Sequence, residues 1–176
     1  MISASTLHVI TTELTIGMFS LAGFCFLMMF IEKGPVVKDS VAHWALAGGL
    51  LFTPLAIITG LNSIQGDEIS SPLLANKMLT SMSAIGLSIG VLWKRIKMGR
   101  QEGYLHPSLG MVATGMILLT AGMGGEYARG ETLIFFLPKT MVFLFPMWAS
   151  IIIMILGIAL IAKAIMTAKS ESPALV

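Results

Sequence analysis

The chain has 176 residues, of which 56% are hydrophobic and only 11% are charged, and its formal net charge is +2. Soluble domains have about 25% charged residues, so this composition excludes an ordinary water-soluble domain. The few charges lie at the ends of apolar stretches rather than in a basic patch, and we expect no nucleic-acid partner.

Five apolar stretches are long enough to cross a bilayer, which takes about 20 helical residues. They cover residues 7–31, 41–63, 73–93, 107–127 and 140–166. Because lipid requires segments of this length to satisfy their backbone as helices, the sequence predicts an all-α integral membrane bundle. We expect four antiparallel spans at 1–132, then a fifth span and a cytoplasmic tail at 133–176. Pro54 and Pro146 lie inside spans and are expected to kink them.

The basic residues predict the orientation of the chain. Eight of the eleven lysines and arginines lie on one side of the predicted spans and three on the other. Cytoplasmic loops carry the excess of such residues. We therefore expect the N-terminus outside and the C-terminus in the cytoplasm, in the cytoplasmic membrane of a bacterium or archaeon.

This orientation places one group of polar residues near the outer face: His8, Glu13, Asn62, Asn76, Lys77, Glu126 and Arg129. Glu13 lies about 9 Å along its span, where a carboxylate costs at least about 2.5 kcal/mol unless it is paired or protonated. An ion pair with Lys77 is the simplest solution, either as a packing salt bridge or beside a lysine that snorkels to the headgroups. A proton or quinol site is the alternative.

His43 and His106 lie near the cytoplasmic ends of two different spans. Two imidazoles at equal depth on separate helices allow a b-type haem, with its metal, between them. Two unrelated interfacial histidines are the simpler alternative. His8 lies on the opposite side without a second histidine, which makes it a poorer haem ligand.

Two glycine-containing helix ends carry a family resemblance. The second span closes in Ala-Ile-Ile-Thr-Gly-Leu-Asn (56–62), and the fourth ends in Ala-Gly-Met-Gly-Gly-Glu-Tyr-Ala-Arg-Gly-Glu (121–131). Over roughly residues 5–132 the chain resembles the four-helix DUF2231 family of predicted membrane proteins. The resemblance implies a membrane bundle linked to respiratory electron transfer, with haem as a proposed ligand. His8 matches a family histidine of the first span, whereas Asn76 and Lys77 stand where the family has one in the third.

We therefore expect a small membrane subunit of a respiratory or other oxidoreductase complex, which supports electron transfer by binding haem b or quinone. The candidate cofactor-binding residues are His8, Glu13, His43, Lys77, His106 and Glu126, with His43 and His106 as metal ligands. The alternative is a cofactor-free structural or assembly subunit, and a small transporter is a weaker third. No nucleophile–base arrangement suggests an enzyme on its own. Expected partners are the lipid bilayer and other membrane subunits or further copies of the chain.

Overall fold

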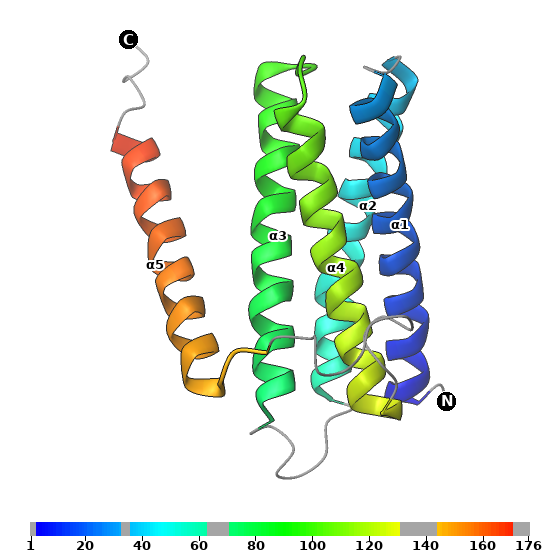
Figure 1. Ribbon diagram of the computed structural model, residues 1–176, viewed down its shortest axis with the longest axis vertical. Helices are drawn as coiled ribbons and strands as arrows, with labels where there is room; N and C mark the ends of the chain where they lie inside the picture. The colour runs from blue at the N-terminus through cyan, green and yellow to red at the C-terminus, as the bar shows by residue number, and fades with distance from the viewer. Residues whose placement is uncertain (1–2, 33–35, 63–70, 131–143, 171–176) are drawn as a thin grey trace.

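The computed structural model describes residues 3–32, 36–62, 71–130 and 144–170. These residues form five helices and no strand (Figure 1), which confirms the predicted all-α architecture for the described part of the chain. The helices are α1 (Ala4–Glu32), α2 (Val36–Leu61), α3 (Pro72–Met98), α4 (Leu105–Arg129) and α5 (Met147–Ser170).

Helices α1 to α4 run alternately up and down and lie side by side (Figure 1). Helix α1 packs against α2 and α4, and α3 packs against α4 with a much smaller contact to α2. Helix α5 contacts α3 and diverges from it towards the C-terminus (Figure 1). The bundle is therefore closed along α1 and more open between α2 and α3.

Three segments are long and apolar enough to cross a membrane: Thr6–Glu32, Val37–Leu61 and Leu105–Tyr127. Large apolar side chains, Trp44 and Leu51 among them, point outward and are exposed on the bundle surface. Such a surface is costly in water and suited to lipid, so these helices indicate a membrane protein. The predicted spans at 73–93 and 140–166 are not among the three, and four spans plus a fifth are not confirmed.

Two phenylalanines fill the centre of the bundle where glycines leave room for them. Phe19 and Phe26 are both fully buried. A Cβ at Gly49 would lie 2.7 Å from the Phe19 ring, and one at Gly110 would lie 2.5 Å from the Phe26 ring. The missing side chains allow the rings to contact the backbones of α2 and α4, as small residues do between membrane helices.

Helix α5 begins after Pro146, so the predicted kink inside a span is wrong at this residue. Residues 144–146 are not helical. The N–H groups of Ala149 and Ser150 donate to the Pro146 carbonyl at 2.9 and 3.1 Å. Proline has no N–H and disfavours a helical residue before it, so it starts α5 rather than bending it. Pro54 does lie inside a helix, α2.

Asn76 anchors the chain segment that leads into α5. Its Nδ2 donates to the Phe145 carbonyl at 2.6 Å and to the Pro72 carbonyl at 2.8 Å. Its Oδ1 accepts the Phe145 N–H at 2.9 Å, and the side chain is buried. This amide therefore ties the start of α5 to α3, a structural role for a residue predicted to belong to an outer polar zone.

The turn between α3 and α4 contains two glycines with left-handed backbone conformations. Gly99 and Gly103 have φ angles of 73° and 87°, which glycine adopts without a steric penalty. The segments 33–35, 63–70 and 131–143 lie outside the described residues.

Candidate functional site

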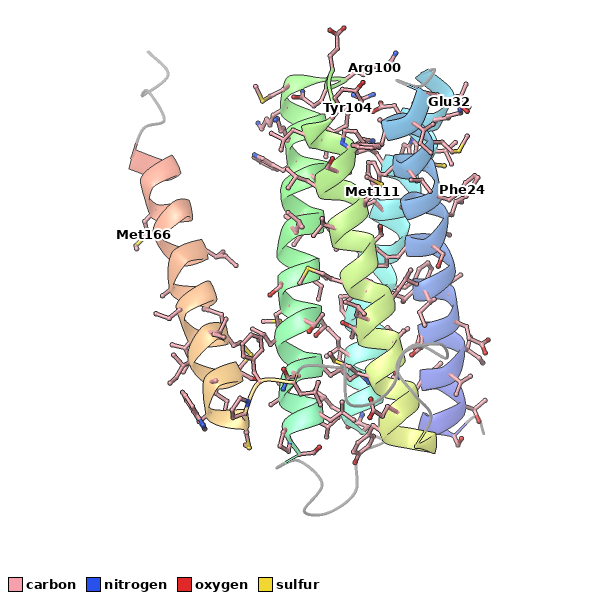
Figure 2. All side chains as sticks on the ribbon, in the orientation of Figure 1. Phe24, Glu32, Arg100, Tyr104, Met111 and Met166 are labelled. Carbon is pink, nitrogen blue, oxygen red and sulfur yellow. The ribbon has the colours of Figure 1, made fainter. Side chains whose placement is uncertain are left out.

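Two groups of polar residues lie at opposite ends of the bundle of α1 to α4. The histidine network consists of Asp39 and His43 on α2, Arg95 on α3 and His106 on α4. The lysine layer consists of His8 and Thr11 on α1, Thr59 on α2 and Lys77 on α3, with Gly60 and Gly124 beside them. Figure 2 labels Glu32, Arg100 and Tyr104 at the end of the bundle where α1 ends and α4 begins, which is the end of the histidine network.

The structure brings His43 and His106 into direct contact. Their Nε2 atoms lie 2.9 Å apart, a hydrogen bond between two neutral or singly charged imidazoles. The ring planes differ by 18° and the centroids are 5.2 Å apart. The rings therefore meet edge to edge, with the two nitrogens between them. Both side chains are buried, with exposed fractions of 6% for His43 and 2% for His106.

The surrounding atoms fix the tautomer of each neutral imidazole. His43 Nδ1 lies 2.7 Å from the Asp39 carbonyl oxygen, which only accepts, so Nδ1 carries the proton. His43 Nε2 then accepts, and His106 Nε2 carries the proton that lies between the rings. The remaining nitrogen, His106 Nδ1, is left with a lone pair. It is buried and has no hydrogen-bond partner among the described residues.

An ion pair closes the network on the α2–α3 side. Asp39 is fully buried. Its Oδ2 accepts a hydrogen bond from Arg95 Nε at 2.6 Å, and Arg95 Nη2 lies at the same distance from that oxygen. The other oxygen, Oδ1, lies 3.5 Å from His43 Nδ1, an electrostatic contact without hydrogen-bond geometry. The buried carboxylate is thus neutralised by Arg95 and also faces the histidine pair.

Phe26 covers the histidine pair from α1. Its ring meets His43 and His106 nearly edge-on, with centroid distances of 5.3 and 6.4 Å. Gly110 on α4 allows this ring to approach, because a Cβ there would overlap it. The pair is therefore enclosed by an apolar ring on one side and by the Asp39–Arg95 ion pair on the other.

This arrangement does not fit a haem held by the two histidines. Such a haem places its iron and macrocycle between the two imidazoles, whereas here the imidazoles bond to each other and Phe26 packs against both. Nor do the described residues contain a cluster of three or more histidine, cysteine or acidic side chains that could hold a metal ion. As the rings are placed, they leave no space for a haem between them, and the roles of His43 and His106 as haem or metal ligands stay predictions.

At the other end, His8 joins α1 to α2. Its Nδ1 lies 3.1 Å from the Ala56 carbonyl and 3.2 Å from Thr59 Oγ1. A Cβ at Gly60 would lie 2.9 Å from His8 Cε1, so only a residue without a side chain lets the imidazole pack against α2 here. Thr59 Oγ1 also lies 3.4 Å from Thr11 Oγ1. The Thr-Gly pair that carried part of the family resemblance thus contacts His8.

Lys77 points into the bundle from α3. Its Nζ lies 3.0 Å from the position that a Cβ would take at Gly124 on α4, and the residue is partly buried. It is also within electrostatic reach of His8. Among the described residues, no carboxylate lies within ion-pair distance of this ammonium group.

The predicted Glu13–Lys77 ion pair is wrong, because the two side chains face different ways. Glu13 is exposed on the outer surface of α1, while the neighbouring inward positions are held by the buried Thr11 and Thr15. Glu126 is partly buried, and its carbonyl accepts the N–H of Gly130, whose φ of 69° caps α4. At this end of the bundle, His8 and Lys77 therefore point inward, whereas Glu13 does not.

Sequence reasoning missed Asp39 and Arg95. Both lie in regions predicted to be linkers, whereas α2 already begins at Val36 and α3 continues to Met98. The spacing of Asp39 and His43, four residues apart, was a usable signal, because it places both on one helix face.

The chain matches no protein-family model, no curated protein and no solved structure. The resemblance of residues 5–132 to DUF2231 therefore stays a prediction.

Proposed function

We propose that this chain is a small subunit of a membrane oxidoreductase assembly, in which the histidine pair relays protons. The observation that carries the proposal is the 2.9 Å hydrogen bond between His43 Nε2 and His106 Nε2 inside a buried, charge-balanced network. Imidazole is the side chain best suited to gain and lose a proton near neutral pH. Electron transfer that consumes or releases protons needs such groups close to the reacting site.

The relay follows from the tautomers. A proton binds the free lone pair of His106 Nδ1, and the proton on His106 Nε2 moves along the hydrogen bond to His43 Nε2. His43 then turns its Nδ1–H from the Asp39 carbonyl to Asp39 Oδ1, 3.5 Å away, and gives up that proton. Asp39 is then a neutral acid, and it must release the proton to restore its ion pair with Arg95. Each ring gains one proton and loses one, so the net charge of the pair is unchanged after the transfer.

The charges around the histidine pair favour passing a proton on rather than keeping it. From α2 it faces Asp39, from α3 it faces Arg95 and Lys94, and from α1 it meets the uncharged Phe26. Since Asp39 and Arg95 already neutralise each other, an added proton leaves an uncompensated positive charge in a buried place. Such a charge is costly, so the pair does not retain the proton.

Proton exchange at the imidazoles tests the relay directly. The full chain is reconstituted in lipid nanodiscs with ¹⁵N-labelled histidine, and exchange of the ring N–H protons with water is measured by NMR. We expect His43 to be protonated at Nδ1 and His106 at Nε2, and both protons to exchange together. Asp39→Asn should slow this exchange, whereas Lys97→Met, an exposed change on α3, should leave it unaltered. Ring protons that stay protected in the unaltered chain contradict the relay.

The oxidoreductase assignment is tested in native membranes. We expect His106→Gln to lower proton-coupled turnover of the assembly while the chain remains incorporated. A reduced-minus-oxidised absorption spectrum of the isolated assembly, compared between this variant and the unaltered chain, tests haem ligation at the same time. Full turnover in His106→Gln contradicts the relay, and loss of b-type bands in this variant contradicts our interpretation of the histidine geometry.

A cofactor-free structural subunit is the second candidate. It is favoured by the way the histidine network joins α2, α3 and α4, and by the extensive apolar surface that is left exposed. In that case the network only fixes the helices relative to one another. Slow imidazole exchange together with a loss of stability in His106→Gln would support this function instead of the relay.

A further inference from the structure

The lysine layer has hydrogen-bonding groups that the described residues do not satisfy. Lys77 presents an ammonium group inside the bundle with no carboxylate in ion-pair range among those residues. An ionised side chain within a membrane bundle is costly unless it is paired, and it marks a functional site by default. Gly124 leaves room beside Nζ, because a Cβ there would lie 3.0 Å from it.

His8 supplies the complementary group. Its Nδ1 faces the Ala56 carbonyl, an obligate acceptor, so neutral His8 carries its proton on Nδ1. The Nε2 atom then presents a lone pair, and no described side chain donates to it. The layer thus combines a strong donor, Lys77 Nζ, with an acceptor, His8 Nε2.

We propose that Lys77 and His8 bind the headgroup of a membrane quinol, an inference that rests on the proposed oxidoreductase function. A quinol hydroxyl donates its hydrogen to His8 Nε2, while its oxygen accepts a hydrogen bond from Lys77 Nζ. An oxygen that only accepts, such as that of a phosphodiester anion, satisfies Lys77 but places a second lone pair against His8 Nε2. The tautomer of His8 therefore selects a hydroxyl over an anion.

An apolar groove next to the layer suits the isoprenoid tail of such a ligand. It lies between α2 and α3, where those helices have little contact, and has a volume of about 370 Å³. Its lining includes Leu50, Ile57, Ile58 and Ile89. Ile58 immediately precedes Thr59 of the lysine layer, so the groove reaches the level of the proposed headgroup site along α2.

Titration with decylubiquinol tests this site. The full chain in nanodiscs, ¹⁵N-labelled at histidine, is titrated with this quinol while the His8 Nε2 resonance is followed. We expect a saturable shift of that resonance, and Lys77→Met should weaken binding at least about tenfold, as expected for the loss of a charged hydrogen bond. His8→Phe should weaken binding similarly. Because this variant has no His8 resonance, its affinity is measured from the fluorescence of the bound quinol. Glu13→Gln, an exposed change on the same helix as His8, should bind normally.

Two further ligands identify the recognised group. The dimethyl ether of the same quinol keeps the ring and tail but has no hydroxyl to donate, and we expect it to bind at least about tenfold more weakly. Phosphatidylglycerol, whose phosphodiester oxygens only accept, should not displace the quinol. Equal binding of quinol and ether, displacement by phosphatidylglycerol, or unchanged affinity in both variants would overturn the proposal. Absence of quinol binding with normal proton exchange at His43 and His106 would overturn this site alone and leave the proposed relay standing.

Discussion

The histidine network and the lysine layer are both polar groups inside an apolar bundle, but only the first is balanced by the chain itself. In the histidine network, Asp39 is matched by Arg95 and the two imidazoles are matched by each other. In the lysine layer, Lys77 has no matching carboxylate among the described residues.

The difference distinguishes two roles for polar side chains that are buried in the bundle. A network whose charges are matched from within can be retained for stability and for proton movement along its own bonds. A layer that keeps a charge unmatched costs stability and is retained where something outside the chain completes it. The comparison predicts opposite effects on stability when charges are removed from the two ends.

The largest effect is expected for Arg95→Met. It leaves the fully buried Asp39 carboxylate without its counter-charge, and breaking a buried pair in this way costs about 3–5 kcal/mol. The free energy of unfolding in detergent micelles measures the change. Lys97→Met on the same helix is the control, because Lys97 is exposed and lies 5.0 Å from the Trp93 ring centroid, a contact worth about 1 kcal/mol or less. Equal losses in both variants would contradict the special role of Arg95.

Gly110→Ala is expected to have the next largest effect. The added Cβ would lie 2.5 Å from the Phe26 ring, which packs against both histidines, so the ring must shift at a cost of about 1–3 kcal/mol. Gly115→Ala in the same helix is the matched control, since nothing lies within 4 Å of its added Cβ. Thermal unfolding of the two variants measures the difference. Equal unfolding temperatures in the two variants would show that the Phe26 ring is loosely packed against the histidine pair.

Asn76→Ala tests whether Asn76, next to Lys77 in the sequence, holds α5 against α3. Its amide makes three hydrogen bonds, two of them to Phe145, and we expect their loss to cost about 1–3 kcal/mol and to widen the distance between α3 and α5. Spin labels on exposed positions of the two helices measure that distance. Ser81→Ala, which removes a local contact to Met78 within α3, is the control. An unchanged distance distribution would contradict the anchoring role.

The sequence predicted the helices because the apolar stretches are long, but it began the second helix too late and ended the third too early. Asp39 and Arg95 were assigned to linkers, since charged residues end an apolar run. The helices continue past that limit, and α2 begins at Val36 while α3 ends at Met98. Only this extension allows Asp39 and Arg95 to meet.

The sequence also did not predict the direction in which each side chain points. His43 and His106 were expected at equal depth, and the structure does bring them together. Glu13 was expected to face Lys77 but points outward. On a helix that is apolar on all sides, the hydrophobic pattern does not indicate which face is buried. The inward face of α1 is instead set by its contacts with α2 and α4, which a single sequence does not contain.

The smallest effect is expected at the lysine layer, and it has the opposite sign. Lys77→Met removes a partly buried ammonium that no described carboxylate balances, and methionine fills the same space. We expect the ligand-free chain to become more stable by about 1 kcal/mol, a fraction of the cost of a lysine at the membrane centre, because Lys77 lies near the start of α3. Unfolding of the variant beside Glu13→Gln, which removes an exposed charge and should change little, measures this gain. A loss of stability in Lys77→Met would mean that the chain does balance this charge, and the contrast between the two ends of the bundle would no longer hold.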